Sequence, residues 1–182
     1  MDADRWALDV DGALIHRAAD DRDLDAAVEI LEEVARWGEA TGYPSWEPGQ
    51  FRSLAGRHRV RVQEALANGD LYVARVGGEP AATISLFEID EVFWPGAPRD
   101  ALYVHKLAVG RSFGGLGLGG SILRWADERA TSKGKAFLRL NCAAEQPRIR
   151  RYYEEAGFVH RGDRTANDFR AALYERPVAP RG

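Results

Sequence analysis

Apolar residues in the first third of the chain recur with helical spacing. Between residues 20 and 40 they return every three or four positions, which is typical of one face of an amphipathic helix. Asp20 or Asp21 stands where a capping side chain would begin this helix. A second, more basic pattern of the same period covers residues 51–68 and ends at a glycine. We therefore expect two helices, separated by a loop that is rich in proline and glycine.

Short apolar runs bounded by turn residues predict strands in the rest of the chain. A run at residues 13–19 precedes the first helix, and Gly77-Gly78 joins two runs that read as a hairpin. The strand–helix–strand section at residues 101–143 requires a parallel pair, so the sheet should be mixed. The expected order is βααβββαβαββ in one α+β domain spanning residues 1–182. The expected strands lie at 13–19, 71–76, 81–89, 101–109, 135–143, 158–163 and 168–178. One later helix is expected to begin after residue 117, and another to cover residues 145–157.

Composition and charge narrow the class of protein. The chain has 182 residues, of which 45% are hydrophobic and 29% charged, as in a globular domain with its own core. A net charge of -3 argues against a general nucleic-acid binder, and no apolar run approaches the length of a membrane span. The single cysteine, Cys142, excludes an internal disulfide and indicates a cytoplasmic protein. The four histidines lack ligand spacing, so no metal is expected.

Five glycines crowd into residues 114–120, between an expected strand and an expected helix. Glycine weakens regular structure, so such a cluster indicates that something needs close access to the backbone. Free N–H groups at a helix N-terminus, with their partial positive charge, suit a pyrophosphate. Tight packing of the loop is the alternative explanation.

Two standard phosphate-binding motifs do not fit this cluster. Gly115-x-Gly117-x-x-Gly120 matches the dinucleotide fingerprint, but that fingerprint should open a doubly wound sheet and be followed by an acidic residue. Asn141 stands at the end of the next strand, and too few residues follow it to complete such a domain. No Gly-Lys-Ser/Thr is present, which excludes a P-loop.

The segment LAVGRSFGGLGLGGSILRWADERA resembles the acetyl-CoA loop of the GNAT family of N-acetyltransferases. The family pattern is Arg/Gln-x-x-Gly-x-Gly/Ala after a strand that ends in Leu-x-Val. Gly117 and Gly119 take the two small-residue positions, while Leu107 and Val109 take the strand end. Gly114 departs from the pattern, because it offers no side chain where the family has Arg or Gln.

A second segment, EQPRIRRYYEEAGF, resembles the family's later Asn-x-x-Ala-x-x-Phe/Leu-Tyr-x-x-x-Gly-Phe motif. Tyr153, Gly157 and Phe158 match it, whereas Gln146 replaces the usual Asn and Ile149 the usual Ala. Two motifs in the correct order and at the correct spacing imply the GNAT fold over nearly the whole chain.

The resemblance implies direct transfer of an acetyl group from acetyl-CoA to an amine. The N–H of Leu107 would donate to the developing oxyanion, and Tyr153 would protonate the leaving thiolate or only pack against the cofactor. Backbone groups of the strand end and the glycine loop would hold acetyl-CoA. The implied cofactor-binding residues are Leu107, Val109, Gly114, Gly115, Leu116, Gly117, Leu118, Gly119, Gly120, Asn141, Gln146 and Tyr153.

His105 is a candidate base for the acceptor amine. Strand alternation would place Tyr103, His105, Leu107 and Val109 on one face, and the resemblance to arylalkylamine-type members points His105 at the acceptor. A structural histidine is the alternative, and the neighbouring carboxylates Glu88, Asp90 and Glu91 are other candidate bases. Cys142 is not expected to be a nucleophile, because transfer in the family is direct.

Aromatic residues on the loops are candidates for binding the acceptor, since rigid rings bury large apolar area at low entropic cost. They predict a small amine with an apolar or aromatic body, whereas packing of the rings is the alternative. A sensor that binds acyl-CoA without useful turnover is the alternative function. Dimers are common in the family, so a homodimer is one state that the resemblance allows. The candidate acceptor residues are Tyr43, Trp46, Glu88, Trp94 and Tyr103.

Overall fold

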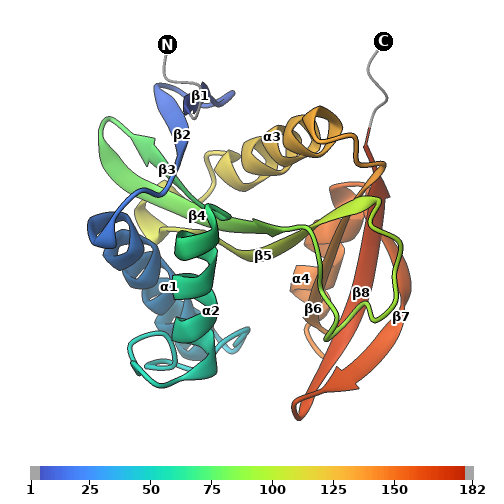
Figure 1. Ribbon diagram of the computed structural model, residues 1–182. Helices are drawn as coiled ribbons and strands as arrows, with labels where there is room; N and C mark the ends of the chain where they lie inside the picture. Colours follow the sequence, from blue (N-terminus) through green and yellow to red (C-terminus); the bar gives the residue numbers. More distant parts are fainter. Residues whose placement is uncertain (1–4, 179–182) are drawn as a thin grey trace. The chain divides into compact units, whose positions relative to one another are not determined.

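A computed structural model describes residues 5–178, which form eight strands and four α-helices (Figure 1). The described residues divide into two compact units. The first unit contains residues 5–85 together with Lys106–Ile122. The second unit contains Leu86–His105 together with residues 123–178. The strands are hydrogen-bonded in the order β1-β2-β3-β4-β5-β6-β8-β7. The elements are β1 (Arg5–Ala7), β2 (Ala13–Arg17), α1 (Asp21–Thr41), α2 (Arg57–Asn68), β3 (Leu71–Val76), β4 (Glu79–Phe87), β5 (Ala101–Val109), a short 3-10 turn (Arg111–Phe113), α3 (Leu118–Ser132), β6 (Phe137–Ala143), α4 (Pro147–Glu155), β7 (Val159–Ala166) and β8 (Phe169–Pro177).

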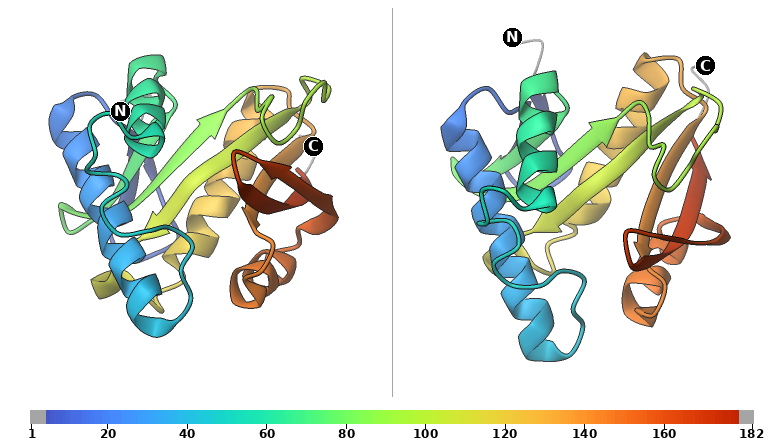
Figure 2. Two further views of the ribbon diagram at one scale, coloured as in Figure 1. Left: turned by 90° about the horizontal axis from the view of Figure 1, so that it is seen from below. Right: turned by 60° about the horizontal axis from the view of Figure 1, so that its bottom comes forward.

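In the first unit, strands β1 to β4 pair antiparallel, and α1 and α2 lie side by side (Figures 1 and 2). The predicted cap of α1 is confirmed, because the Asp20 carboxylate accepts hydrogen bonds from the N–H groups of Arg22 and Asp23. Gly42 ends the helix in the left-handed conformation (φ 76°) that glycine adopts readily. Strand β1 was not predicted from the sequence, since its three residues carry too short a pattern.

A buried carboxylate fixes the loop between α1 and α2. The Glu32 side chain accepts hydrogen bonds from the N–H groups of Gly49 and Phe51, both at 2.8 Å, and it is only 1% exposed. The sequence prediction of a helix from residue 51 was wrong at its start, because α2 begins at Arg57. The Phe51 N–H is committed to Glu32, and Gly56 is extended just before the helix.

Replacing Glu32 with glutamine is expected to lower the free energy of unfolding by about 1–2 kcal/mol, because a charged acceptor of two buried N–H groups becomes a neutral amide. Urea unfolding followed by circular dichroism measures this change. Glu29→Gln on the same helix is the matched control, since Glu29 forms an exposed ion pair with Arg52 that contributes little. Equal stability losses in the two variants would contradict this role of Glu32.

In the second unit, β6 pairs with β5 in the parallel direction and with β8 in the antiparallel direction. Residues Ala101–Val104 of β5 pair parallel to Phe137–Leu140, which confirms the predicted parallel pair. Strand β8 runs antiparallel to β6 and pairs with β7 at the edge. The sheet is therefore mixed, as the α+β prediction required. Helix α4 packs on β6 (Figure 1).

Strand β5 contains one residue that interrupts its extended backbone. Lys106 has φ 52°, a left-handed conformation that is uncommon for a residue other than glycine. The sequence argument placed Tyr103, His105, Leu107 and Val109 on one face by continuous alternation. That argument does not extend past Lys106, because alternation requires a regular extended chain.

The described helices do not include one that is long and apolar enough to cross a bilayer. Between residues 5 and 178, no group of three or more His, Cys, Asp or Glu side chains is arranged to hold a metal ion.

Candidate active site

The glycine loop of the first unit leads from the end of β5 into α3. Gly115 (φ 81°) and Gly117 (φ 76°) adopt the left-handed conformation, and a Cβ built on either would meet nothing within 4 Å. Helix α3 begins directly afterwards at Leu118, and the Ser121 N–H donates to the Gly117 carbonyl at 3.1 Å. The first N–H groups of a helix lack partners within that helix, so this loop offers donors and open space to a pyrophosphate.

The base of the loop is anchored within the same unit. The Gly110 N–H donates to the Ala81 carbonyl at 2.8 Å, and the Arg111 N–H donates to the Glu33 carboxylate at 3.1 Å. The Arg111 guanidinium lies 4.0 Å from the centroid of the Trp37 ring. It is also 3.3 Å from the point where a Cβ of Gly114 would stand. A positive charge therefore lies beside the position where Gly114 lacks the family's Arg or Gln.

In the second unit, His105 is held by a buried carboxylate. Its Nε2 lies 3.0 Å from Oδ2 of Asp90, and the Phe87 ring packs edge-on at 5.2 Å between centroids. The other oxygen of Asp90 accepts hydrogen bonds from the N–H groups of Val92 and Phe93. The Asp90 side chain is 2% exposed and that of His105 18%. The pair is thus rigidly placed while part of the imidazole stays accessible.

The protonation state of Asp90 sets the tautomer of His105. Burial by itself would raise the pKa of Asp90, but the hydrogen bond and charge of His105 and the N–H donors of Phe93 and Val92 outweigh it and lower the pKa. An ionised carboxylate only accepts hydrogen bonds, so Nε2 of His105 must carry the proton. A neutral His105 then has its lone pair on Nδ1, as a general base requires.

The other two candidate carboxylates are engaged elsewhere. Glu88 forms ion pairs with Lys133 (2.6 Å) and Lys135 (3.2 Å), and the hydrogen bond from Lys133 is the main cause that lowers the pKa of Glu88. Glu91 accepts a hydrogen bond from the Gly96 N–H. Both carboxylates are therefore engaged with groups other than His105.

Tyr153 of α4 is 7% exposed, and its ring packs against those of Tyr152, Phe158 and Tyr174. Burial, with smaller effects from Cys142 and Tyr152, raises the pKa of Tyr153 well above its usual value. The phenol therefore stays protonated at neutral pH. It is able to donate a proton, although the raised pKa makes the transfer less favourable.

The remaining residues predicted in this unit lie on β6 and α4. Asn141 is half-buried in β6, and Gln146 stands at the N-terminus of α4. Cys142 is buried, and burial raises its pKa to about 12, so it remains a thiol at neutral pH. A thiol in this state is a poor nucleophile, in agreement with the expectation of direct transfer.

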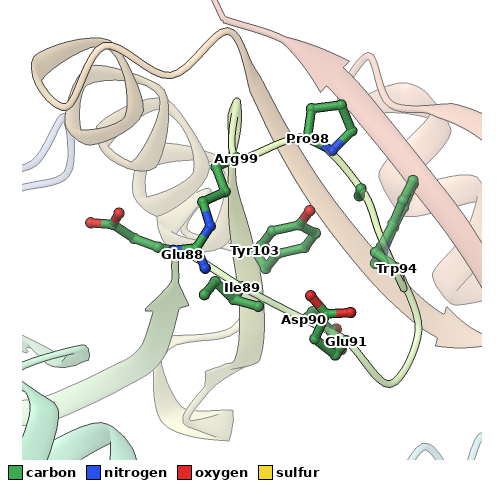
Figure 3. Close-up of a pocket in the computed structure, with 9 residues that line it drawn as sticks. Glu88, Ile89, Asp90, Glu91, Trp94, Pro98, Arg99 and Tyr103 are labelled. Carbon is green, nitrogen blue, oxygen red and sulfur yellow. The ribbon is translucent and has the colours of Figure 1, made fainter.

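Three of the five predicted acceptor residues line one small cavity of the second unit: Glu88, Trp94 and Tyr103 (Figure 3). Its volume is about 30 Å³, close to that of one water molecule. The Glu88 carboxylate points away from the Trp94 ring, and the buried Tyr103 hydroxyl meets the Arg139 guanidinium at 3.1 Å. The cavity as it stands admits a water molecule or a single small group.

The other two predicted acceptor residues belong to the first unit. Tyr43 is exposed, and Trp46 is half-buried with its ring 5.5 Å from the Lys106 ammonium. Sequence reasoning missed both Lys106 and Arg111. The left-handed backbone of Lys106 left no signal in the pattern, and Arg111 lies outside the matched motif positions.

Comparisons with known proteins identify the family of this chain. Residues 30–158, more than half of the chain, match the model of the acetyltransferase (GNAT) family. The uncharacterised N-acetyltransferase YesJ of Bacillus subtilis (strain 168) is 27% identical over 145 residues, which are 77% of this chain and 78% of YesJ.

Solved structures share the fold. A GNAT acetyltransferase from Listeria monocytogenes 4b F2365 has a TM-score of 0.75 at 19% identity, covering 95% of this chain and 99% of that one. The aminoglycoside acetyltransferase AAC(6')-Ib in complex with coenzyme A has a TM-score of 0.68 at 20% identity, covering 91% and 94%. The chain therefore belongs to the acetyltransferase (GNAT) family and is an N-acetyltransferase with acetyl-CoA as its co-substrate.

Proposed function

We propose that the acceptor is a small amine with an apolar or aromatic body and that His105 is the base that deprotonates it. The observation that carries this proposal is the His105–Asp90 pair, in which a buried carboxylate fixes the imidazole with Nδ1 as the basic atom. His105 also lies only two residues before Leu107, the predicted oxyanion donor.

The chemistry follows from the protonation of the acceptor. An alkylamine has a pKa near 10.4, so most of it arrives as ammonium and must lose a proton before it attacks. In the proposal Nδ1 of His105 takes this proton, and the Asp90 carboxylate stabilises the resulting imidazolium. The same logic makes Asp90 a positioning residue, because it acts on the substrate only through His105.

The remaining roles concern the bound co-substrate, which supplies the thioester. Backbone groups of Leu107 and Val109 would hold its pantetheine arm, and the Leu107 N–H would donate to the thioester oxygen as negative charge develops there. The N–H groups of the glycine loop, with the Arg111 guanidinium beside them, would bind the pyrophosphate. Tyr153 would supply the proton for the departing thiol.

Replacing Asp90 with asparagine is expected to lower kcat by about 10- to 100-fold while the KM for acetyl-CoA stays nearly constant, because the orienting charge on His105 is lost. Steady-state kinetics measure both constants. Glu91→Gln is the control, since Glu91 is the adjacent exposed carboxylate with no contact to His105. If Asp90→Asn loses stability but keeps its kcat, Asp90 is structural and does not position His105.

The acceptor class is tested by thiol release from acetyl-CoA with a panel of amines. Arylalkylamines and other small apolar amines are expected to give a higher kcat/KM than aminoglycosides or peptides with free N-termini. Turnover restricted to aminoglycosides or peptides would contradict the proposed acceptor. Binding of acetyl-CoA without thiol release for any amine would instead favour the sensor function. A cytoplasmic location and a homodimer remain predictions from the sequence.

A further inference from the structure

Lys106 forms a cluster with side chains of the loop and helix that precede β3 in the first unit. Its ammonium nitrogen lies 2.9 Å from Nδ1 of His58. It also lies 5.3 Å from the centroid of the Phe51 ring and 5.5 Å from that of Trp46. The Trp46 and Phe51 rings meet edge-on at 5.4 Å, and Phe51 meets His58 at 5.6 Å. A single ammonium group is thus set among three rings.

The backbone holds Lys106 there at a conformational cost. Its φ of 52° is the left-handed conformation, which costs an L-residue about 1–2 kcal/mol. Strained residues of this kind persist where the surrounding structure fixes them, and they cluster at functional sites. Lys106 also directly precedes Leu107, the predicted oxyanion donor.

The positive charge of the cluster is that of the Lys106 ammonium. Within residues 5–178, no carboxylate forms an ion pair or hydrogen bond with Lys106. Burial is the main cause that lowers the pKa of Lys106 to about 8, and the charges of Arg61 and Arg57 add to it. Burial, Lys106 and Arg57 likewise lower the pKa of His58 to about 4, so His58 is neutral and its Nδ1 accepts a hydrogen bond from the ammonium.

Helix α2 adds to the positive potential. It begins at Arg57, and its N-cap, Gly56, has no side chain to accept hydrogen bonds from the first N–H groups. The helix dipole therefore places a partial positive charge one residue before His58. An ammonium substrate would be repelled from this cluster, whereas an anion would offset its charge.

We propose that Lys106, with His58 and the start of α2, binds a carboxylate carried by the acceptor amine. This inference rests on the proposed function and narrows its substrate class to amines that combine an aromatic or apolar body with a carboxylate, as in amino acids. The rings of Trp46 and Phe51 provide apolar surface beside the carboxylate site. The Lys106 ammonium has N–H donors beyond the one that His58 accepts, and these would bond the carboxylate.

Binding of matched N-acetylated products tests the inference without turnover. The probes are an N-acetylated aromatic amino acid and the corresponding N-acetylated arylalkylamine, which differ only in the carboxylate and contain no titrating amine. Calorimetry is expected to give a Kd at least about tenfold lower for the carboxylated probe. Lys106→Met is expected to remove this difference, whereas Lys106→Arg keeps part of it. Lys133→Met is the control, since Lys133 pairs with Glu88 in the other unit.

The pH dependence gives a second readout that a variant's stability does not affect. Lys106 is charged below its pKa of about 8, so the preference for the carboxylated probe should be present at pH 7 and lost as pH rises through 8. Among the described residues, the charges that act on Lys106 are those of Arg57 and Arg61 on α2, and arginine in proteins keeps its charge over this range. His58 stays neutral because its pKa is about 4.

The outcomes separate this inference from the proposed function. Equal Kd values for the two probes, or a difference that survives in Lys106→Met, would overturn the carboxylate site. Inorganic phosphate that binds in a Lys106-dependent way while the two probes bind equally would assign the cluster to a free anion and also overturn it. Failure of every amine to release thiol, with the Lys106-dependent difference intact, would overturn the proposed function alone.

Discussion

His105→Gln is expected to lower kcat by about 100- to 1,000-fold, because the variant loses the group that accepts the proton of the acceptor amine. Glutamine preserves a hydrogen-bonding side chain of similar size next to Asp90 but is not a base. The KM for acetyl-CoA should change by less than about threefold, since His105 is not among the residues proposed to hold the co-substrate. Steady-state kinetics with a saturating amine measure both constants.

His160→Gln is the matched control for this variant. His160 also pairs with a carboxylate, Asp163, at 2.8 Å, but it lies on the edge strand β7 and has no proposed role. The kcat should fall in His105→Gln and stay near the wild-type value in His160→Gln. A His105→Gln enzyme with the wild-type kcat would show that another group or water removes the proton.

Gly117→Val is expected to raise the Kd for acetyl-CoA by about a hundredfold, which corresponds to about 2.7 kcal/mol. Gly117 has φ 76°, which a β-branched residue adopts only with strain, and the space beside it is open. A valine side chain there would occupy the space through which the pyrophosphate reaches the loop N–H groups. Calorimetric titration with acetyl-CoA measures the change.

Gly134→Val controls for backbone strain alone. Gly134 has φ 68°, a Cβ on it would also meet nothing within 4 Å, and it lies in the turn that follows α3. The two variants should lose similar stability, yet only Gly117→Val should lose affinity for acetyl-CoA. If both bind acetyl-CoA as the wild type does, the loop does not hold the co-substrate at Gly117.

Local signals in the sequence were enough to predict most of the fold. The helical period and the cap at Asp20 predicted α1, and Gly77-Gly78 predicted the β3–β4 hairpin. The glycine cluster predicted a loop between a strand and a helix, and the structure has that order. These features depend on residues close together in the chain, so periodicity and turn chemistry reveal them.

Features that depend on distant residues were not predictable in this way. The start of α2 depends on a hydrogen bond from Phe51 to Glu32, nineteen residues away. The left-handed backbone of Lys106 has no sequence signature, because lysine at that position matches an ordinary strand pattern. The positions of these residues in space become visible only once the chain has folded.

The sequence indicated which segments form the candidate site, but not which of their side chains contact one another. Motif spacing pointed to the glycine loop and to His105, whose roles remain predictions. Asp90 was only one of three carboxylates named as alternative bases in the sequence, and the structure distinguishes it by its contact with His105, fifteen residues away. Periodicity did not indicate that Tyr103 would be buried against Arg139 or that the Trp46 ring would lie beside an ammonium.

The central claim, direct acetyl transfer to a small amine, is tested most directly by counting both products of one reaction. The chain is incubated with acetyl-CoA and an apolar or aromatic amine, free thiol is quantified by colorimetry, and the N-acetylated amine is quantified by mass spectrometry. The account predicts that the two products appear at equal rates and that both rates fall together in His105→Gln. Thiol release without acetylated amine, or no release with any small amine, would contradict it.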